Sequence, residues 1–336
     1  MKLHSLLLGL LALVFSAAAM AQQPIVIKFS HVVSPDTPKG KGAERYKELV
    51  EKRTGGRVKV ELYPNSQLYK DREEMEALQL GAVQMLAPSM AKFGPMGLRE
   101  FELFDLPYIF PSSEVLYRVM DGEIGRKLFD KMETKGIKGL AYWDNGFKSF
   151  SANRPLRKLD DFKGLKTRIQ SSKVLEAQMK ALGANPQAMA FSEVYTALQT
   201  GTVDGTENPH SNFYTQKMNE VQKHMTISDH GYIGYAVVVN KKFWEGLPAD
   251  IRKILDEAMV DATKYERVIA RVENDEALAK VKAAKTTEVY VLPDSERLVW
   301  QKAMLPVHKQ FEEAIGKETI QAVYKIAAEA AQARRK

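Results

Sequence analysis

The chain has 336 residues, no cysteine and a formal net charge of +7 at pH 7. The absence of cysteine excludes disulfides, zinc–thiolate sites, iron–sulfur clusters, thiol catalysis and a lipid-modified cysteine. The positive charge does not predict nucleic-acid binding, because basic and acidic residues are interleaved, as in Lys47-Glu48 and Glu51-Lys52, and a modest excess of cations instead suits the capture of anions.

The first 21 residues have the pattern of a secretory signal peptide. A short basic start is followed by an apolar run from Leu6 to Phe15 and by the small residues Ala19-Met20-Ala21. This run is too short to span a bilayer, and the ending fits an A-x-A cleavage site. We predict cleavage before Gln22 and export of a protein without a membrane anchor to a bacterial periplasm.

The first half of the mature chain alternates between strand and helix patterns, which is typical of an α/β fold. Strands are predicted over 25–30, 58–63, 85–87 and 138–143, and helices over 40–54, 71–80 and from Ser113 toward Lys131. Asp71 resembles an N-cap with Glu74 three residues on. The sequence Asp144-Asn145-Gly146 has turn chemistry and is predicted to end the strand before it.

The second half repeats this alternation and predicts a second α/β unit. Its strands are predicted over 148–152, 164–170, 186–190, 203–208, 226–230, 234–240 and 289–292, and its first helices over 171–182 and 192–201. A long helical pattern follows, with Pro248 just inside its start and its end near Lys285. An unbroken helix of that length would exceed about 50 Å, so we expect it to span both domains.

Arg168 is the strongest candidate for a binding residue. In the stretch 164–170, apolar and polar residues alternate, which predicts a strand with one cationic face and places Arg168 near its carboxyl end. That end of a strand faces the ligand crevice in open α/β sheets, and a guanidinium offers two parallel donors to a carboxylate. The alternative from these residues alone is an exposed arginine on an edge strand.

Other cationic and amide side chains also lie at predicted strand ends. Lys39 follows the first strand, Lys148 follows the predicted turn, and Asn208 ends a strand. Each alone could be a solvated surface residue. Together with Arg168 they would surround one cleft with positive charge, which a buried dianion requires.

Enzyme and cofactor signatures are absent from the sequence. It contains no G-x-S-x-G, P-loop, H-E-x-x-H or strand-to-helix G-x-G-x-x-G motif, and its histidines lack metal-ligand spacing. We therefore expect no metal and no cofactor. A glycosidase pair of carboxylates is neither shown nor excluded, because the sequence does not say which acids approach one another.

Several ordered motifs together resemble the extracytoplasmic solute receptors of tripartite ATP-independent periplasmic (TRAP) transporters, and most closely the DctP-type, C4-dicarboxylate-binding branch. The likeness covers essentially the whole mature chain. It rests on the segments 34–40, 76–84, 144–148, 151–155, 161–170 and 203–209, the last of which reads Val-Asp-Gly-Thr-Glu-Asn-Pro.

The resemblance implies a role for each candidate residue. Arg168 matches the arginine that forms a two-pronged salt bridge with the ligand carboxylate, and Asn208 matches the amide that supports the same group. Lys148 occupies a second cationic position, and Lys39 matches a lysine that could hold the distal carboxylate. Phe191 matches a pocket aromatic. Arg72 stands at a position that varies in the family.

The resemblance also implies two α/β domains linked by crossing strands, with a long helix spanning both. We expect domain I to comprise residues 22–145 and 234–273, and domain II residues 146–233 and 274–330. The implied function is capture of a small carboxylate such as succinate, malate or fumarate by hinge closure, followed by docking to two integral membrane subunits. We expect a monomer.

Two hypotheses from other classes stay open at this point. The first is a secreted hydrolase or lyase that acts on an anionic substrate. The second is a receptor domain that presents its ligand to a sensor kinase.

Overall fold

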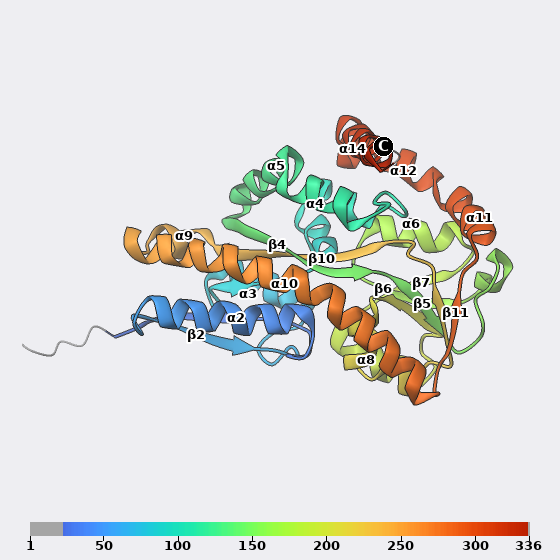
Figure 1. The fold of residues 1–336 in the computed structure, drawn as a ribbon, viewed down its shortest axis with the longest axis horizontal. Coiled ribbons are helices and arrows are strands. Elements are labelled where there is room, and N and C mark those ends of the chain that lie inside the picture. The colour runs from blue at the N-terminus through green and yellow to red at the C-terminus, as the bar shows by residue number, and fades with distance from the viewer. Residues whose placement is uncertain (1–22, 335–336) are drawn as a thin grey trace, which may run out of the picture.

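The computed structural model describes residues 23–334, so the predicted signal peptide and the residue after its cleavage site lie outside the described residues. This part of the chain contains two β-sheets surrounded by helices (Figure 1), which confirms the predicted α/β class. We call the unit built on each sheet a lobe. The first sheet has the strand order β2 (Val58–Tyr63), β1 (Ile25–Ser30), β3 (Met85–Leu86), β10 (Tyr232–Asn240), β4 (Ile137–Phe147). The second has the order β11 (Glu288–Val291), β9 (His224–Ile227), β5 (Ser149–Ala152), β8 (Gly205–Asn208), β6 (Lys166–Ile169), β7 (Asn185–Ala188).

The first lobe begins with a parallel β–α–β unit. Helix α2 (Pro38–Arg53) starts at Thr37, whose side chain accepts a hydrogen bond from the backbone N–H of Gly40. Its apolar face packs against the strands, with Tyr46 fully buried beside Phe29. Because β1 is parallel to both β2 and β3, the carboxyl ends of these strands meet at one edge of the sheet.

The second lobe presents its strand ends in the same way. Strand β6 is parallel to β7 and β8, so the end of β6 at Ile169 and the end of β8 at Asn208 lie at the same edge. Its helices are α6 (Lys173–Ala181), α7 (Val194–Gln199) and α8 (His210–Thr215). Behind the sheet, Phe150, Phe162 and Trp300 form an edge-to-face aromatic cluster in the core of this lobe.

Two strands connect the lobes. Strand β4 of the first sheet runs through Lys148 into β5 of the second, and β10 brings the chain back after β9. The turn predicted at Asp144-Asn145-Gly146 is wrong, because all three residues belong to β4. An Asn-Gly pair forms a hairpin where its flanking strands pair with each other, whereas here β4 pairs with the distant strand β10.

Helix α10 (Ala249–Ala284) spans both lobes, as predicted (Figure 1). It packs on α2 and β4 in the first lobe and on α8 in the second. Pro248 is the residue that precedes the helix rather than a residue just inside it. No helix within residues 23–334 is long and apolar enough to cross a membrane.

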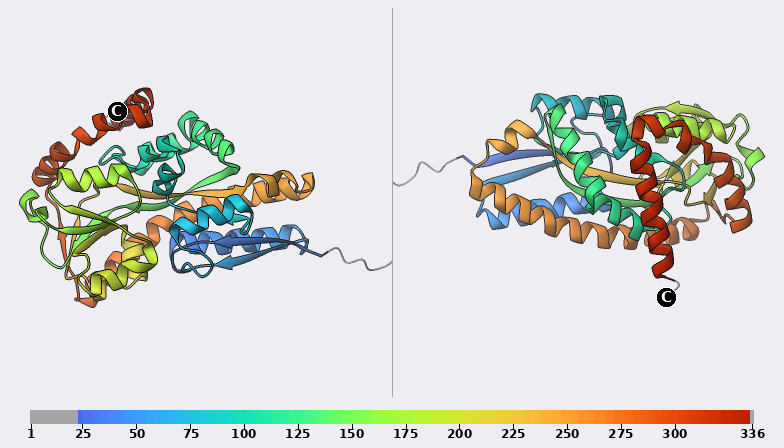
Figure 2. Two further views of the ribbon diagram at one scale, coloured as in Figure 1. Left: turned by 180° about the vertical axis from the view of Figure 1, so that it is seen from behind. Right: turned by 90° about the horizontal axis from the view of Figure 1, so that it is seen from above.

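The remaining helices complete the two lobes. They are α3 (Asp71–Leu80), α4 (Ser113–Asp121), α5 (Glu123–Met132), α9 (Lys241–Glu245), α11 (Asp294–Met304), α12 (Pro306–Gln310), α13 (Glu312–Ile315) and α14 (Lys317–Ala333). The single helix predicted from Ser113 toward Lys131 is two helices, separated by Gly122 in an extended conformation. The segment from α11 to α14 leaves the second lobe and ends against α4 of the first, where Arg334 pairs with Glu114 (Figure 2).

Candidate anion-binding site

A cavity lies between the lobes, at the carboxyl ends of β1, β6 and β8, and its empty space of about 330 Å³ includes a part that is open to solvent. Its lining comes from both lobes and comprises Val32, Val33, Lys39, Asp71, Ser89, Lys92, Arg168, Gln170, Phe191, Asn208, Asn212, Ile233 and Tyr235. Four of the six predicted site residues are therefore brought together here, namely Lys39, Arg168, Phe191 and Asn208. Lys148 and Arg72 do not line this cavity.

Arg168 lies on β6 and is only 3% exposed, unlike an arginine on a solvated edge strand. Its Nε and Nη2 donate to the backbone carbonyl of Met189 at 3.2 and 2.9 Å, and its guanidinium lies 5.6 Å from the centre of the Phe191 ring. None of the hydrogen bonds found among residues 23–334 uses Nη1. The carbonyl therefore fixes one side of the guanidinium, and the other side is available to an anion.

Lys39 lies in the first turn of α2 and is 1% exposed. Its Nζ donates to the carbonyl of Ala87 at 2.9 Å and lies 3.8 Å from the centre of the Tyr235 ring. Within the described part of the chain, no carboxylate lies within 4.0 Å of this amine. Burial, and then repulsion by Lys92, lower the pKa of Lys39 to about 7.

Lys92 is a second buried amine of the first lobe, and no pattern in the sequence singles it out. Its Nζ pairs with Asp71 Oδ1 at 2.6 Å and with Glu74 Oε1 at 2.7 Å. The expected capping role of Asp71 is thus wrong, because Lys70 is the N-cap residue of α3 and makes no side-chain cap. Burial would raise the pKa of Asp71, but Lys92 and Arg168 outweigh it and hold the carboxylate ionised.

Two asparagines of the second lobe contribute amide groups to the cavity. Asn208 at the end of β8 and Asn212 in α8 are both almost fully buried, and the Oδ1 atom of each has no hydrogen-bond partner among residues 23–334. The Nδ2 of Asn208 makes only long contacts, to Thr206 Oγ1 at 3.4 Å and to Met218 Sδ at 3.5 Å. A buried polar atom without a partner is costly, so both amides are suited to contact a polar ligand.

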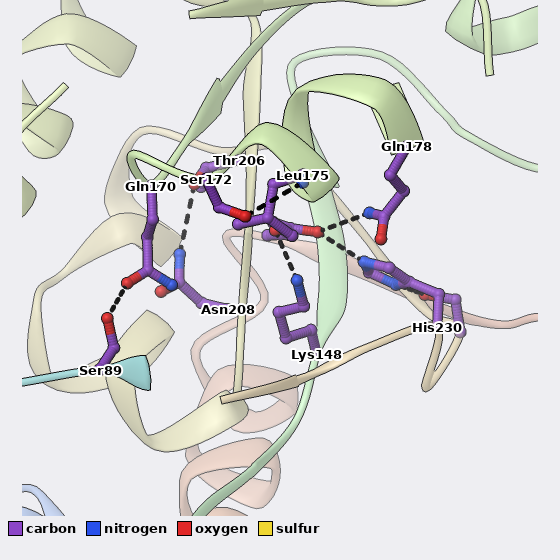
Figure 3. Close-up of polar contacts among 11 residues, drawn as sticks. Ser89, Lys148, Gln170, Ser172, Leu175, Gln178, Thr206, Asn208 and His230 are labelled. Atoms are coloured by element: carbon purple, nitrogen blue, oxygen red, sulfur yellow. Dashed lines mark hydrogen bonds and ion pairs between the residues drawn. The ribbon is translucent and has the colours of Figure 1, made fainter. Parts of the chain in front are cut away.

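Lys148 does not line the cavity and lies in a buried polar network of the second lobe (Figure 3). Its Nζ pairs with Glu207 Oε1 at 2.6 Å, and Glu207 Oε2 contacts His230 Nε2 at 2.7 Å and Gln178 Nε2 at 3.2 Å. Burial would raise the pKa of Glu207, but Lys148 and His230 lower it below its ordinary value. The charge of Lys148 is therefore neutralised by the residue that precedes Asn208.

Arg72 lies outside the cavity on α3, where its side chain is 91% exposed and pairs with Glu76. It lines a larger outer groove that also reaches Asp71, Lys92 and Arg168. This groove is the mouth of the cleft between the lobes.

Several contacts among the described residues hold the lobes together, and three of them lie beside the cavity. The backbone N–H of Phe191 donates to Asp71 Oδ2 at 2.7 Å, Lys70 pairs with Glu193 at 2.9 Å, and Ser89 contacts Gln170 (Figure 3). The cavity is thus enclosed by residues from both sides. Three cationic side chains and one carboxylate line it. Lys92 is paired with Asp71 and Glu74, whereas no carboxylate within residues 23–334 forms an ion pair with Arg168 or Lys39.

Comparison with known proteins identifies the family. Residues 29–314 match the family model described as "DctP: Bacterial extracellular solute-binding protein, family 7". The chain is 65% identical to the C4-dicarboxylate-binding periplasmic protein DctP of Rhodobacter capsulatus, over 95% of this chain and 96% of that protein. The chain belongs to the DctP family of bacterial extracellular solute-binding proteins.

Solved structures of DctP-family proteins share this architecture. A TRAP periplasmic solute-binding protein of Shewanella oneidensis with bound succinate superposes with a TM-score of 0.88 at 44% identity, covering 90% of this chain and 99% of that one. One from Pseudomonas aeruginosa with bound L-malate gives a TM-score of 0.83 at 44% identity, covering 85% of this chain and 100% of that one. The resemblance drawn from the sequence motifs is confirmed, and so is the two-lobed fold with its long helix. The DctP family is one of solute-binding proteins rather than of enzymes.

Proposed function

We propose that this protein captures a C4-dicarboxylate such as succinate, malate or fumarate between its lobes and delivers it to the two integral membrane subunits of a TRAP transporter. The observation that carries the proposal is the cavity, which is lined from opposite lobes by Arg168 and Lys39, two buried cations with no carboxylate partner among residues 23–334. A dianion with a carboxylate at each end would neutralise both. Monocarboxylates would leave one buried cation uncompensated.

Each predicted site residue has a place in this proposal. Arg168 binds one carboxylate as a fork, supported by Asn208, while Lys39 receives the distal carboxylate and Phe191 packs beside Arg168. Lys148 supports the site indirectly, because it neutralises Glu207, the residue before Asn208. Arg72 lies at the mouth of the cleft, where it would meet anions before they enter.

The relatives support a carboxylate as the ligand. The Rhodobacter capsulatus protein is named for C4-dicarboxylate binding, and related structures hold succinate and L-malate. A sugar-acid-binding relative from Advenella mimigardefordensis, 35% identical, holds galactonate. The same fold thus accepts carboxylates of different length.

Capture requires that the lobes separate and close. We propose residues 22–145 and 234–273 as domain I and 146–233 and 274–330 as domain II, joined by the crossing strands. Strands β4 and β10 extend slightly beyond these boundaries, so the proposed hinge would fall within paired strands. We further propose that the protein acts as a monomer in the periplasm, after removal of a signal peptide before Gln22.

A thermal-shift screen across carboxylic acids tests the function. A true ligand at 100 times its dissociation constant adds about 2.7 kcal/mol to the free energy of unfolding. We expect C4-dicarboxylates to raise the melting temperature and acetate to leave it unchanged. Following the same acids by NMR separates binding from catalysis: unchanged ligand supports a receptor, and turnover would support the secreted hydrolase or lyase. No stabilisation by any dicarboxylate would refute the proposal.

A further inference from the structure

Asn145 occupies an irregular position on the crossing strand β4. Gly146 pairs with Ile233 of β10, and Asp144 pairs with Gly234, so that Asn145 is an extra residue with no counterpart on β10. Such a bulge redirects a side chain and is common beside functional sites. The side chain of Asn145 is fully buried.

The amide of Asn145 contacts both lobes. Its Nδ2 donates to the hydroxyl of Tyr235 on β10 at 2.8 Å, and its Oδ1 accepts from the hydroxyl of Ser211 in the first turn of α8 at 3.1 Å. Its backbone carbonyl accepts from Nδ2 of Asn274 on α10. The Oδ1 of Asn274 in turn accepts a hydrogen bond from the backbone N–H of Ser211 at 2.9 Å. One bulged residue therefore ties together β10, α8 and α10.

The two side-chain contacts of Asn145 connect it to residues that line the cavity or lie next to its lining. Tyr235 lines the cavity, and its ring lies under the Nζ of Lys39. Ser211 belongs to the helix that carries Asn212, another lining residue, and this helix follows Asn208 through Pro209. A shift of Asn145 would thus displace the Tyr235 ring that contacts Lys39. It would also displace the amides of Asn208 and Asn212.

We propose that Asn145 is a positioning residue for anion binding, which holds Tyr235 beneath Lys39 and α8 beside the cavity so that the two lobes grip the ligand in one geometry. The proposal rests on the function proposed above. It also gives a role to the Asp-Asn-Gly motif, which the binding site itself does not use.

The test compares succinate binding and release in four single variants. Tyr235→Phe and Ser211→Ala each delete one hydrogen bond to Asn145, and each should weaken succinate binding about fivefold through faster release. Asn145→Ala deletes both and should weaken binding by about 25-fold. The matched control is Asn240→Ala. Asn240 is a buried asparagine at the far end of β10, where it binds the carbonyls of Leu78 and Gln79. Its loss should lower the melting temperature of the free protein and leave succinate affinity unchanged.

A double variant and a pH profile distinguish positioning from general stability. Because Tyr235→Phe removes a bond that Asn145→Ala already lacks, the double variant should bind no more weakly than Asn145→Ala. Loosening Tyr235 should also weaken its cation–π contact with Lys39, which favours the ammonium form, so that affinity declines at a lower pH than in the wild type.

The outcomes separate this proposal from the proposed function. Wild-type affinity in Tyr235→Phe and Ser211→Ala would overturn the positioning role, even if Asn145→Ala failed to fold. The proposal would also be overturned if Asn240→Ala, at a similar loss of stability, weakened succinate binding as much as the variants of Asn145, Tyr235 and Ser211 do. Failure of the wild-type protein to bind any dicarboxylate would instead refute the function on which it rests.

Discussion

Affinity for a dicarboxylate should fall as the pH rises through about 7, because Lys39 must carry its proton to attract a carboxylate. A bound carboxylate would stabilise the ammonium form and raise the pKa of Lys39 in the complex. The complex therefore holds more protons than the free protein above pH 7, and binding takes up a proton. Full affinity is expected below the pKa of the free protein, and affinity is lost progressively above it.

The size of the effect follows from the free pKa of about 7. The dissociation constant should be about twice its low-pH limit at pH 7 and about tenfold above it at pH 8. Proton uptake should rise from about 0.5 per ligand at pH 7 to about 0.9 at pH 8. The charged or titratable neighbours of Lys39 are Lys92, Glu74, Asp71, Glu266 and His31. His31 is buried, its pKa is lowered to about 3, and it stays neutral throughout this range.

Isothermal titration calorimetry in two buffers of different ionisation enthalpy measures both quantities. Lys39→Met should bind succinate weakly at every pH and take up no proton. Asp105 provides the control, because burial raises its pKa to about 7 although it does not line the cavity. If Lys39→Met keeps the wild-type pH dependence and Asp105→Asn loses it, or if the wild type takes up no proton at pH 8, our reasoning about Lys39 is wrong.

Three further substitutions test other parts of the site. Arg168→Lys should lose most of the affinity although the charge remains, because a lysine cannot contact Met189 and a carboxylate as a planar fork; unchanged affinity by calorimetry would remove Arg168 from the centre of the site. Lys148→Met leaves Glu207 buried without its cation and should lower the free energy of unfolding by about 3–5 kcal/mol in urea titrations. A loss below about 1 kcal/mol would show that His230 alone compensates the charge of Glu207. Gly146→Ala should destabilise the protein by at least about 1 kcal/mol in the same assay, because Gly146 has a φ of +132° and an added Cβ would lie 3.0 Å from Asn274 Nδ2; wild-type stability would mean that β4 adjusts freely.

The parts of the site that sequence could predict are those fixed by local pattern. Arg168 lies one residue before the end of β6 and Asn208 ends the parallel strand β8, and the carboxyl ends of parallel strands share an edge of the sheet, so their proximity follows from topology. The predicted long helix is equally local, since its pattern repeats along one segment. The family resemblance then supplied the expected roles of Lys39 and Phe191.

The parts that sequence missed depend on contacts between distant segments. Asp71 and Glu74 have the spacing of a capping box, and only the fold shows that they bind Lys92 instead. Lys148 follows a strand end as expected, but Glu207, far along the chain, neutralises it within the second lobe. The turn predicted around Asn145 failed for the same reason, because the pairing partner of β4 is β10.

Helix α10 also bears on how the molecule loses its structure. Its two halves pack against the cores of different lobes. Unfolding of either lobe would therefore remove packing contacts from one continuous helix that the other lobe also needs. The protein should therefore unfold as one cooperative unit despite its two sheets, giving a single calorimetric peak. A ligand held by either lobe would then protect the entire chain against heat and proteases.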